Sequence, residues 1–354
     1  MLNKLILVGG FLGSGKTTLL AEAARRLAKR DKLVGLVTND QAPELVDTLL
    51  LTGVGKGVSE LAGSCFCCNF NGFVDSIKSL IKQGAEIIIA EPVGSCTDLS
   101  ATIMNPLKKF YPNWNLAPLT VLVDPNRLPE IFGKMESGID SDALYIMQLQ
   151  LAEADRILVS KSDLLSDANK KNAQTLLEKE LPEKKIGFIS SKTGDGFDAW
   201  FSDIQSADDA GTTIVPVDYD RYAHGEAVLG WLNATAKVVP NTDGKKLLTE
   251  LLTAFLSEIK KTNSEVGHVK ALLNVGGTEW IGNLTSLKGA VDVQETESKS
   301  GNTILVLNAR VQMPPETLEM LVRNLFKTFD LSLDSLRCLM PGYPNPTHRL
   351  TDHV

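Results

Sequence analysis

Short, nearly continuous apolar runs rich in β-branched residues recur along the first two hundred positions of the chain. Segments in which apolar residues have helical spacing separate most of these runs. Buried strands that alternate with helices predict a mostly parallel sheet covered by helices on both faces, an α/β fold. The predicted strands cover 4–10, 33–40, 85–94, 119–125, 155–163 and 185–194, and the predicted helices cover 17–30, 72–83 and 168–181.

The pattern changes near residue 205, where small, polar and turn-forming residues replace the apolar runs. Further on, adjacent strands joined by short turns predict a smaller α+β domain, with an antiparallel sheet on one helical layer. We therefore predict a first domain at 1–208, a linker at 209–218 and a second domain at 219–354. The second domain is predicted to have strands at 226–239, 268–275, 278–286, 290–298 and 303–311, and helices at 245–262 and 315–329.

Length and charge narrow the class of protein. A chain of 354 residues is long for one compact core, in agreement with two domains. The net charge of −7 argues against a general nucleic-acid binder. No apolar run approaches the ~20 residues that span a bilayer, and the N-terminal apolar run continues into a glycine loop, so it predicts a buried strand rather than a signal peptide. We expect a cytoplasmic protein with neither nucleic-acid partners nor membrane insertion.

The stretch after the first predicted strand fits the phosphate-loop pattern G-x-x-x-x-G-K-[ST], at Gly10, Gly15, Lys16 and Thr17. A strand before it and a helix after it are the context that the pattern requires. The glycines let successive N–H groups point inward, Lys16 reaches the β- and γ-phosphates, and the Thr17 hydroxyl ligates Mg²⁺. The residues predicted to bind the triphosphate are Gly10, Gly13, Ser14, Gly15, Lys16, Thr17 and Thr18.

Two later loops favour guanine as the base. The stretch V-S-K-S-D resembles the guanine-reading N-K-x-D pattern, with Lys161 and Asp163 in the two base-contacting roles. Ser191 and Lys192 follow the next predicted strand and resemble the loop that closes over guanine. Ser160 stands where the pattern has asparagine, so GTP is favoured and ATP stays open.

Hydrolysis would use groups at the carboxyl ends of the strands, where open α/β sheets place their active sites. Glu91 can hold Mg²⁺ or its water, and Gly94 can present its N–H to the γ-phosphate. Asp40 is a second candidate for a Mg²⁺ or water contact, whereas Glu44 and Asp47 fit a solvated loop equally well. No arginine stands out as a catalytic finger, so intrinsic turnover should be slow. The predicted catalytic residues are Lys16, Thr17, Asp40, Glu91 and Gly94.

The chain has five cysteines, and three of them, Cys65, Cys67 and Cys68, fall within four positions. An odd, clustered set is a poor disulfide framework and more often binds metal. Two or three thiolates suit Zn²⁺, Cu⁺ or Co²⁺, although a buried apolar patch or a redox pair would have the same spacing. Cys96 lies close after Gly94, so it is either a further ligand in one nucleotide state or a buried cysteine. Cys338 is predicted to be structural.

Together these motifs resemble the CobW-like family of metal-handling P-loop GTPases. The resemblance is carried by Gly10 to Thr18, by C-x-C-C at Cys65, Cys67 and Cys68, by E-x-x-G at Glu91 to Gly94, and by Lys161 and Asp163. It implies a GTPase whose C-x-C-C motif lies between two switch regions and binds zinc or cobalt in coordination with nucleotide and Mg²⁺. It further implies delivery of that metal to a client metalloprotein or a cofactor-assembly enzyme, with client contacts made by the second domain. A homodimer is left open.

Two other functions remain as alternatives. The first is a P-loop kinase or ATPase that acts on a small molecule, with structural cysteines; no acceptor-binding motif is visible. The second is a redox-sensing module without catalysis, which would carry no metal under reducing conditions. The family relatives often have a histidine-rich tract, but the four histidines here are scattered. The leading hypothesis predicts that nucleotide and metal each change the affinity for the other by the same factor.

Overall fold

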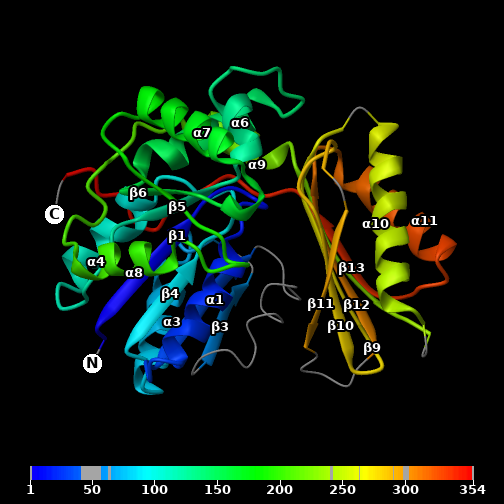
Figure 1. Cartoon of the computed structure of the whole chain (residues 1–354), viewed down its shortest axis with the longest axis horizontal. Coiled ribbons are helices and arrows are strands. Elements are labelled where there is room, and N and C mark those ends of the chain that lie inside the picture. The colour runs from blue at the N-terminus through cyan, green and yellow to red at the C-terminus, as the bar shows by residue number, and fades with distance from the viewer. Residues whose placement is uncertain are drawn as a thin grey trace.

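The computed structural model of the protein describes residues 2–40, 57–62, 65–239, 242–262, 264–289, 291–297 and 303–352. Figure 1 shows two units side by side. The N-terminal unit has helices around a sheet, and the C-terminal unit has a sheet with helices on the side that faces away from its neighbour. Both chain ends lie at the N-terminal unit, so the chain crosses to the second unit and returns.

The N-terminal sheet has seven strands in the order β3-β2-β4-β1-β5-β6-β7, and every pairing is parallel. Its strands are β1 (Lys4–Gly9), β2 (Val34–Asp40), β3 (Gly57–Ala62), β4 (Ile87–Glu91), β5 (Thr120–Val123), β6 (Arg156–Val159) and β7 (Lys185–Phe188). β1, β4, β5 and β6 are buried throughout, as their unbroken apolar runs predict. The order brings the carboxyl ends of β1, β2 and β4 together.

Helices cover both faces of this sheet. One face packs on α1 and α8, through a core that includes Leu19 and Trp200, and the other packs on α3 and α6, through Phe73 and Met147. The helices are α1 (Lys16–Ala28), α3 (Phe70–Lys82), α4 (Asn105–Phe110), α5 (Leu128–Ile131), α6 (Ser141–Glu153), α7 (Asp167–Glu180) and α8 (Phe197–Ser206), with short helices η1 (Ser100–Met104), η2 (Pro125–Arg127) and η3 (Ser162–Leu164). The predicted α/β class is confirmed.

The C-terminal sheet has six antiparallel strands in the order β11-β10-β9-β12-β8-β13. Its strands are β8 (Gly230–Lys237), β9 (Val266–Val275), β10 (Thr278–Leu284), β11 (Asp292–Glu297), β12 (Ile304–Val311) and β13 (Ser332–Leu339). The two helices α10 (Gly244–Lys260) and α11 (Pro315–Thr328) pack on one face of the sheet through a shared apolar core. The predicted antiparallel α+β unit is therefore confirmed.

The predicted strand at 226–239 begins too early, because its first residues belong to a helix, α9 (Tyr219–Ala227). The Asp218 side chain accepts hydrogen bonds from the backbone N–H groups of Asp220 and Arg221 and so begins a helix in a stretch that reads as a linker. α9 lies against α6, where Arg221 Nε is 2.8 Å from an oxygen of Asp142. The domain boundaries stay predictions. Among the described helices, none combines the length and the apolar character needed to cross a bilayer.

Candidate nucleotide and metal site

The loop between β1 and α1 curls through three glycines with left-handed backbone angles. Gly10, Gly13 and Gly15 have φ of +127°, +75° and +95°, which glycine adopts without strain. A side chain at Gly10 would also collide with the backbone, since its Cβ would lie 2.3 Å from the Leu122 oxygen. The loop therefore requires glycine at these positions, and it ends at the N-terminus of α1, where backbone N–H groups favour an anion.

The reactive side chains of this loop meet a carboxylate at the end of β4. The Thr17 hydroxyl donates to Glu91, at 2.9 Å and 3.1 Å from its two oxygens. Lys16 Nζ lies 3.7 Å from Glu91 Oε1 and donates to the Phe11 carbonyl at 3.2 Å. All three side chains are buried. The structure thus brings together the predicted phosphate-binding and Mg²⁺-binding groups, although Lys16 and Glu91 are 75 positions apart.

The loop fits a triphosphate and its metal ion. The Ser14 hydroxyl is buried, and no protein group described here bonds to its oxygen, although buried polar atoms in proteins normally have a partner. The left-handed glycines and the start of α1 turn backbone N–H groups toward one side of the loop. Hydroxyl and carboxylate oxygens beside them are the ligands that Mg²⁺ prefers. Thr18, in contrast, is exposed on α1.

The predicted base-reading residues lie at the carboxyl ends of β6 and β7. Lys161 has a left-handed backbone (φ +54°), and its Nζ lies 2.6 Å from Asp124 Oδ2. Asp163 accepts a hydrogen bond from the Ser190 hydroxyl at 2.7 Å, which aims the carboxylate from the neighbouring loop. The Ser160 hydroxyl donates to the Val123 carbonyl at 3.2 Å, so it anchors the strand end. Ser191 and Lys192 lie in the turn after β7, next to Ser190.

Part of the predicted catalytic set cannot be placed. Asp40 ends β2, the strand next to β4, but its side chain lies outside the described residues. Glu44 and Asp47 fall in 41–56, also outside the described residues. Gly94 lies in the turn after β4. A Cβ atom added to Gly94 would lie 3.1 Å from the Leu12 nitrogen, so the turn runs close to the backbone of the phosphate loop.

The turn before α3 gathers the cysteine trio. The Sγ atoms of Cys65 and Cys67 are 3.1 Å apart, those of Cys67 and Cys68 are 3.9 Å apart, and all three lie within 4.8 Å of one another. Cys65 and Cys67 are buried and Cys68 is half-buried. The backbone turns because Asn69 N donates to the Cys65 carbonyl at 2.9 Å, after which Asn69 caps α3. The turn therefore presents three soft ligands to one point.

The thiols of the cysteine turn differ in pKa. Hydrogen bonds from the neighbouring thiols lower the pKa of Cys65, so Cys65 loses its proton most readily. Interaction with the Cys65 sulfur as a hydrogen-bond acceptor raises the pKa of Cys68 to about 11 and, with burial, keeps the pKa of Cys67 and Cys96 above the ordinary value. A thiolate surrounded by thiols suits a soft divalent cation, which displaces the remaining protons when it binds.

Two connections link the cysteine turn to the nucleotide side. Asn39, next to Asp40 at the end of β2, accepts a hydrogen bond from Phe66 N at 2.9 Å and donates to the Leu61 carbonyl at 2.7 Å. The second connection is Cys96, which is buried in the same core as Cys65 and Cys67 and lies close enough to their thiols to shift their pKa. Cys96 lies five residues after Glu91, so one short segment contacts both groups.

Buried groups from α6 and α9 hold that segment. Gln150 Nε2 donates to the carbonyls of Gly94 and Cys96 at 3.1 Å and 2.8 Å. The Ser95 hydroxyl donates to the buried carboxyl group of Glu226. The turn after β4 is therefore fixed from two helices, one of which follows the predicted linker. Sequence analysis missed Asn39, Gln150 and Glu226, because their roles depend on long-range contacts and none belongs to a motif.

A second buried carboxyl group, Glu153 of α6, predicts a pH effect on stability. Burial raises its pKa from 4.5 to about 8, although it accepts hydrogen bonds from the Thr97 hydroxyl and from Ser100 N. The folded chain binds this proton more tightly than the unfolded chain. Its stabilisation is therefore complete below about pH 4.5 and is lost as the pH rises through about 8, at ~1.4 kcal/mol for each unit of pKa difference.

We expect Glu153→Gln to remove this loss, so that the variant gains stability relative to the native chain between pH 6 and about 9. Chemical unfolding at a series of pH values measures the difference. The matched control is Glu178→Gln, on the exposed face of α7, which should leave the pH dependence unchanged. A constant difference between Glu153→Gln and the native chain over this range would contradict the assignment.

The C-terminal sheet lies directly against the phosphate loop. A Cβ on Gly13 would be 2.9 Å from Thr285 Cγ2 and 3.7 Å from His268 Cδ2. Arg127, after β5, donates to the carbonyls of Val266 and Thr285 at 2.9 Å and 2.6 Å. The second unit therefore contacts the nucleotide side through β9 and the residue after β10, which no motif in the sequence indicates.

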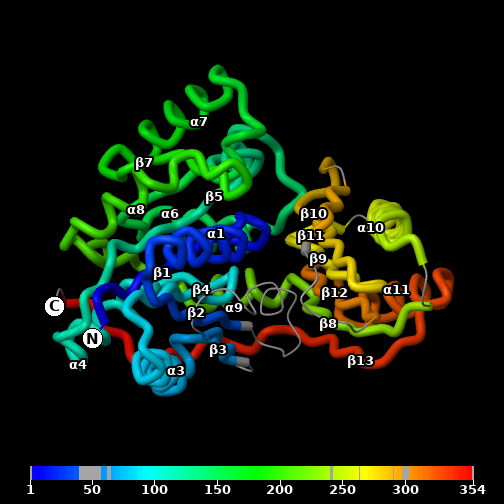
Figure 2. Tube along the Cα trace, turned by 60° about the horizontal axis from the view of Figure 1, so that its bottom comes forward, coloured from blue at the N-terminus to red at the C-terminus, as the bar shows by residue number. Residues whose placement is uncertain are grey.

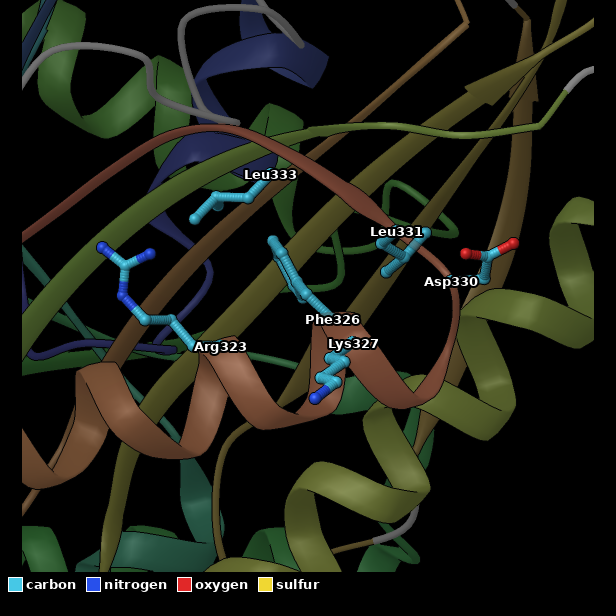
Figure 3. Close-up of a pocket in the computed structure, with 6 residues that line it drawn as sticks. All are labelled: Arg323, Phe326, Lys327, Asp330, Leu331 and Leu333. Carbon is cyan, nitrogen blue, oxygen red and sulfur yellow. The ribbon is translucent and has the colours of Figure 1, made fainter.

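Two other features do not join this site. A cavity of about 360 Å³ lies in the C-terminal unit between α11 and β13, and Figure 3 shows Arg323, Phe326 and Lys327 of α11 among the residues that line it. None of its six lining residues is a predicted site residue. A cluster of the half-buried Asp140 and Asp142 with the exposed His224 has metal-ligand chemistry, but Arg221 already pairs with Asp142.

Comparison with known proteins agrees with this site. Residues 4–187, more than half of the chain, match the family model described as CobW/HypB/UreG, nucleotide-binding domain. The chain is 30% identical over 161 residues to the zinc chaperone YeiR of Escherichia coli (strain K12), covering 44% of this chain and 46% of YeiR. It is 25% identical over 167 residues to the zinc chaperone YjiA of the same organism, covering 46% and 51%. The chain thus spans about half the length of the curated relatives it matches.

The chain is also similar to solved structures of YjiA and HypB. The Zn(II)-bound YjiA GTPase from E. coli is 14% identical, with a TM-score of 0.36, over 91% of this chain and 98% of that chain. HypB from Helicobacter pylori in complex with nickel is 22% identical, with a TM-score of 0.39, over 57% of this chain and 84% of that chain.

Proposed function

The chain belongs to the CobW/HypB/UreG nucleotide-binding family, and from that premise we propose that it is a GTP-hydrolysing metallochaperone. In this proposal the cysteine turn binds zinc or cobalt as cargo, the nucleotide state sets the affinity for that cargo, and the metal passes to a client metalloprotein or cofactor-assembly enzyme. A cytoplasmic location and a homodimer stay predictions.

The phosphate loop supports hydrolysis by positioning and charge. Lys16 is buried beside Glu91, so its ammonium group is fixed where the β- and γ-phosphates would lie. Mg²⁺, held by Thr17 and Glu91, would neutralise charge on the phosphates. Glu91 orients the attacking water from the end of β4, and Gly94 presents its N–H to the terminal phosphate. Asp40 is the proposed further water or Mg²⁺ contact.

Guanine recognition is assigned to the loops after β6 and β7. Asp163 would accept from the ring N–H and the exocyclic amine, and Ser190 already aims its carboxylate. The Lys161 stem would pack on the base, while its ammonium group stays within reach of Asp124. Ser191 and Lys192 would close the loop over the base. These contacts favour guanine, because adenine offers no donor pair to that carboxylate.

The cargo site is the thiol group of Cys65, Cys67 and Cys68. Three thiolates fit Zn²⁺ or Co²⁺, and a tetrahedral ion would keep one position for a further ligand. A closed structural zinc site has four protein ligands, whereas a carrier must release its ion. We assign the remaining position to Cys96 in one nucleotide state and to a ligand of the client in the other.

One observation carries the coupling of nucleotide to metal. The segment from Glu91 to Cys96 contacts the Thr17 hydroxyl at one end and, at the other, shares a buried core with Cys65 and Cys67. A change in the position of Glu91 when Mg²⁺ and the terminal phosphate bind would displace Cys96 relative to Cys65. Since linkage is reciprocal, metal binding must then alter the affinity for GTP by the same factor.

The experiment is a zinc titration of the anaerobic, reduced protein with a non-hydrolysable GTP analogue and Mg²⁺, and in parallel with GDP. We expect about 5- to 100-fold tighter zinc binding in the triphosphate state. Cys96→Ser should remove most of that difference, because it removes the ligand that the nucleotide moves. GTP and ATP turnover, measured on the same samples, should favour GTP.

Cys338→Ser is the matched control, because that thiol lies in the C-terminal unit and donates to the Pro315 carbonyl. Equal zinc affinities in both nucleotide states would contradict the coupling. If Cys96→Ser left the ratio of the two zinc affinities unchanged, Cys96 would not be a ligand of the site. Phosphate transfer to a small acceptor, with zinc-free native protein, would instead favour a P-loop kinase with structural cysteines.

A further inference from the structure

The chain returns to the cysteine turn after its last strand. Residues 340–352 leave β13 and run back across the N-terminal unit, as the red trace in Figure 2 shows. This stretch follows a fully formed sheet and contributes no strand to it. Its contacts with the N-terminal unit are therefore not needed to complete the C-terminal sheet.

The first contact is with the backbone that carries two of the thiols. Thr347 N donates to the Cys67 carbonyl at 2.8 Å, and the Thr347 hydroxyl donates to the Cys68 carbonyl at 3.1 Å. One residue thus fixes two successive peptide groups of the cysteine turn from outside.

The second contact is with the segment that follows Cys96. Arg349 Nε lies 2.6 Å from an oxygen of the buried Asp98, whose backbone is left-handed (φ +62°). Leu350 N donates to the Ala101 carbonyl at 2.9 Å, and Asn105 donates back to the Leu350 carbonyl at 2.9 Å. The returning stretch therefore binds both cysteine-bearing segments.

Aromatic packing and prolines hold the stretch in an extended form. The His348 ring lies edge-on to Phe70, at 5.1 Å between ring centroids, and 5.0 Å from the Phe110 ring. Pro344 and Pro346 restrict the backbone before Thr347, so less conformational entropy is lost when the stretch docks. Thr347 itself is exposed, so the contact can open without unfolding a core.

We propose that residues 344–352 form a clasp over the metal site, with Thr347 as a positioning residue for the thiols of Cys67 and Cys68. The inference rests on the proposed metal cargo. The docked clasp fixes the turn in which the sulfurs converge, and it limits access to them. Cys68 is the half-buried cysteine whose carbonyl accepts the Thr347 hydrogen bond, so its sulfur becomes accessible first when the clasp opens. The client's ligand would then replace Cys68 on the metal.

The test compares two hydroxyl deletions in the same stretch. Thr347→Val removes the bond to the Cys68 carbonyl, whereas Tyr343→Phe removes a hydroxyl that donates to Asp220, at 3.1 Å, away from the turn. Each protein is loaded with Co²⁺, and transfer to excess chelator is followed by the loss of cobalt–thiolate absorption. We expect about three- to tenfold faster transfer from Thr347→Val, and native rates from Tyr343→Phe and Thr347→Ser.

A second measurement needs no metal. The rate at which a thiol reagent labels Cys68 in the metal-free protein should rise in Thr347→Val, and rise further in Thr347→Val combined with His348→Ala. If native protein binds no Co²⁺ or Zn²⁺, the metal cargo is refuted while the labelling rates still decide the clasp. If Thr347→Val bound metal normally and its transfer and labelling rates equalled those of the native protein, the clasp would be overturned. Equal melting temperatures of Thr347→Val and Tyr343→Phe would show that faster metal transfer and labelling do not come from a general loss of stability.

Discussion

Lys16→Ala is expected to lower kcat for GTP hydrolysis by a factor of about 10³ or more. The Lys16 ammonium group is buried between the Phe11 carbonyl and Glu91, so it is already fixed beside the loop that binds the phosphates. A charge held in a site with little water stabilises the developing negative charge far more than a mobile one. No second lysine lies in the loop from Gly10 to Thr18, so nothing in that loop can replace it.

The measurement is phosphate release under saturating GTP and Mg²⁺, together with the GTP dissociation constant. Lys29→Ala is the control, because Lys29 is exposed at the other end of the same helix, α1, and its loss should leave turnover unchanged. If Lys16→Ala kept turnover within tenfold of the native protein while still binding GTP, the proposed hydrolytic site would be wrong. Thermal unfolding of the nucleotide-free variant shows whether a loss of activity is a loss of fold.

The sequence predicts the phosphate loop well because its determinants are local. Gly10, Gly13 and Gly15 need left-handed backbone angles, and a strand before and a helix after complete the requirement within a few residues. The cysteine spacing is local in the same way. Patterns of this kind need no knowledge of which strands are neighbours, so the chemistry of each half of the site can be predicted without the fold.

The link between the two halves could not be predicted, because it depends on strand order. Placement of β4 beside β1 brings Glu91 to Thr17, and pairing of β2 with β3 brings Asn39 to the cysteine turn. A run of apolar strands gives no signal of that order. The contact of Thr347 with Cys68 spans 279 positions and uses side chains that read as an ordinary exposed tail.

Some elements were missed for the opposite reason, because their own sequence misleads. α6 carries the buried polar residues Gln150 and Glu153, so its apolar face is interrupted and its helical period is weak. β13 alternates between exposed and half-buried residues at the edge of the C-terminal sheet, and such a strand differs little from a loop in hydrophobicity. In both cases tertiary contacts override a weak local pattern.

Simultaneous replacement of Cys65, Cys67 and Cys68 by serine is expected to reduce bound zinc or cobalt from about one equivalent to none. Serine keeps the size and the hydrogen bonding of the turn, but its hydroxyl does not ionise near neutral pH, so it is a poor ligand for a soft cation. Nucleotide binding should persist, since the side chains of Lys16 and Thr17 are positioned by Glu91 and not by the replaced thiols.

The individual replacements should differ in a way that tests the charge distribution. Cys65 is the thiol whose pKa is lowered by its neighbours, so Cys65→Ser removes the thiol that loses its proton most readily and should weaken binding most. Metal analysis by mass spectrometry, on protein purified without oxygen, measures stoichiometry, and competition with a chelator measures affinity. Native metal content in the triple variant would place the cargo elsewhere in the chain. The cysteine turn would then serve only as packing for α3, and the nucleotide side would be an ordinary hydrolase.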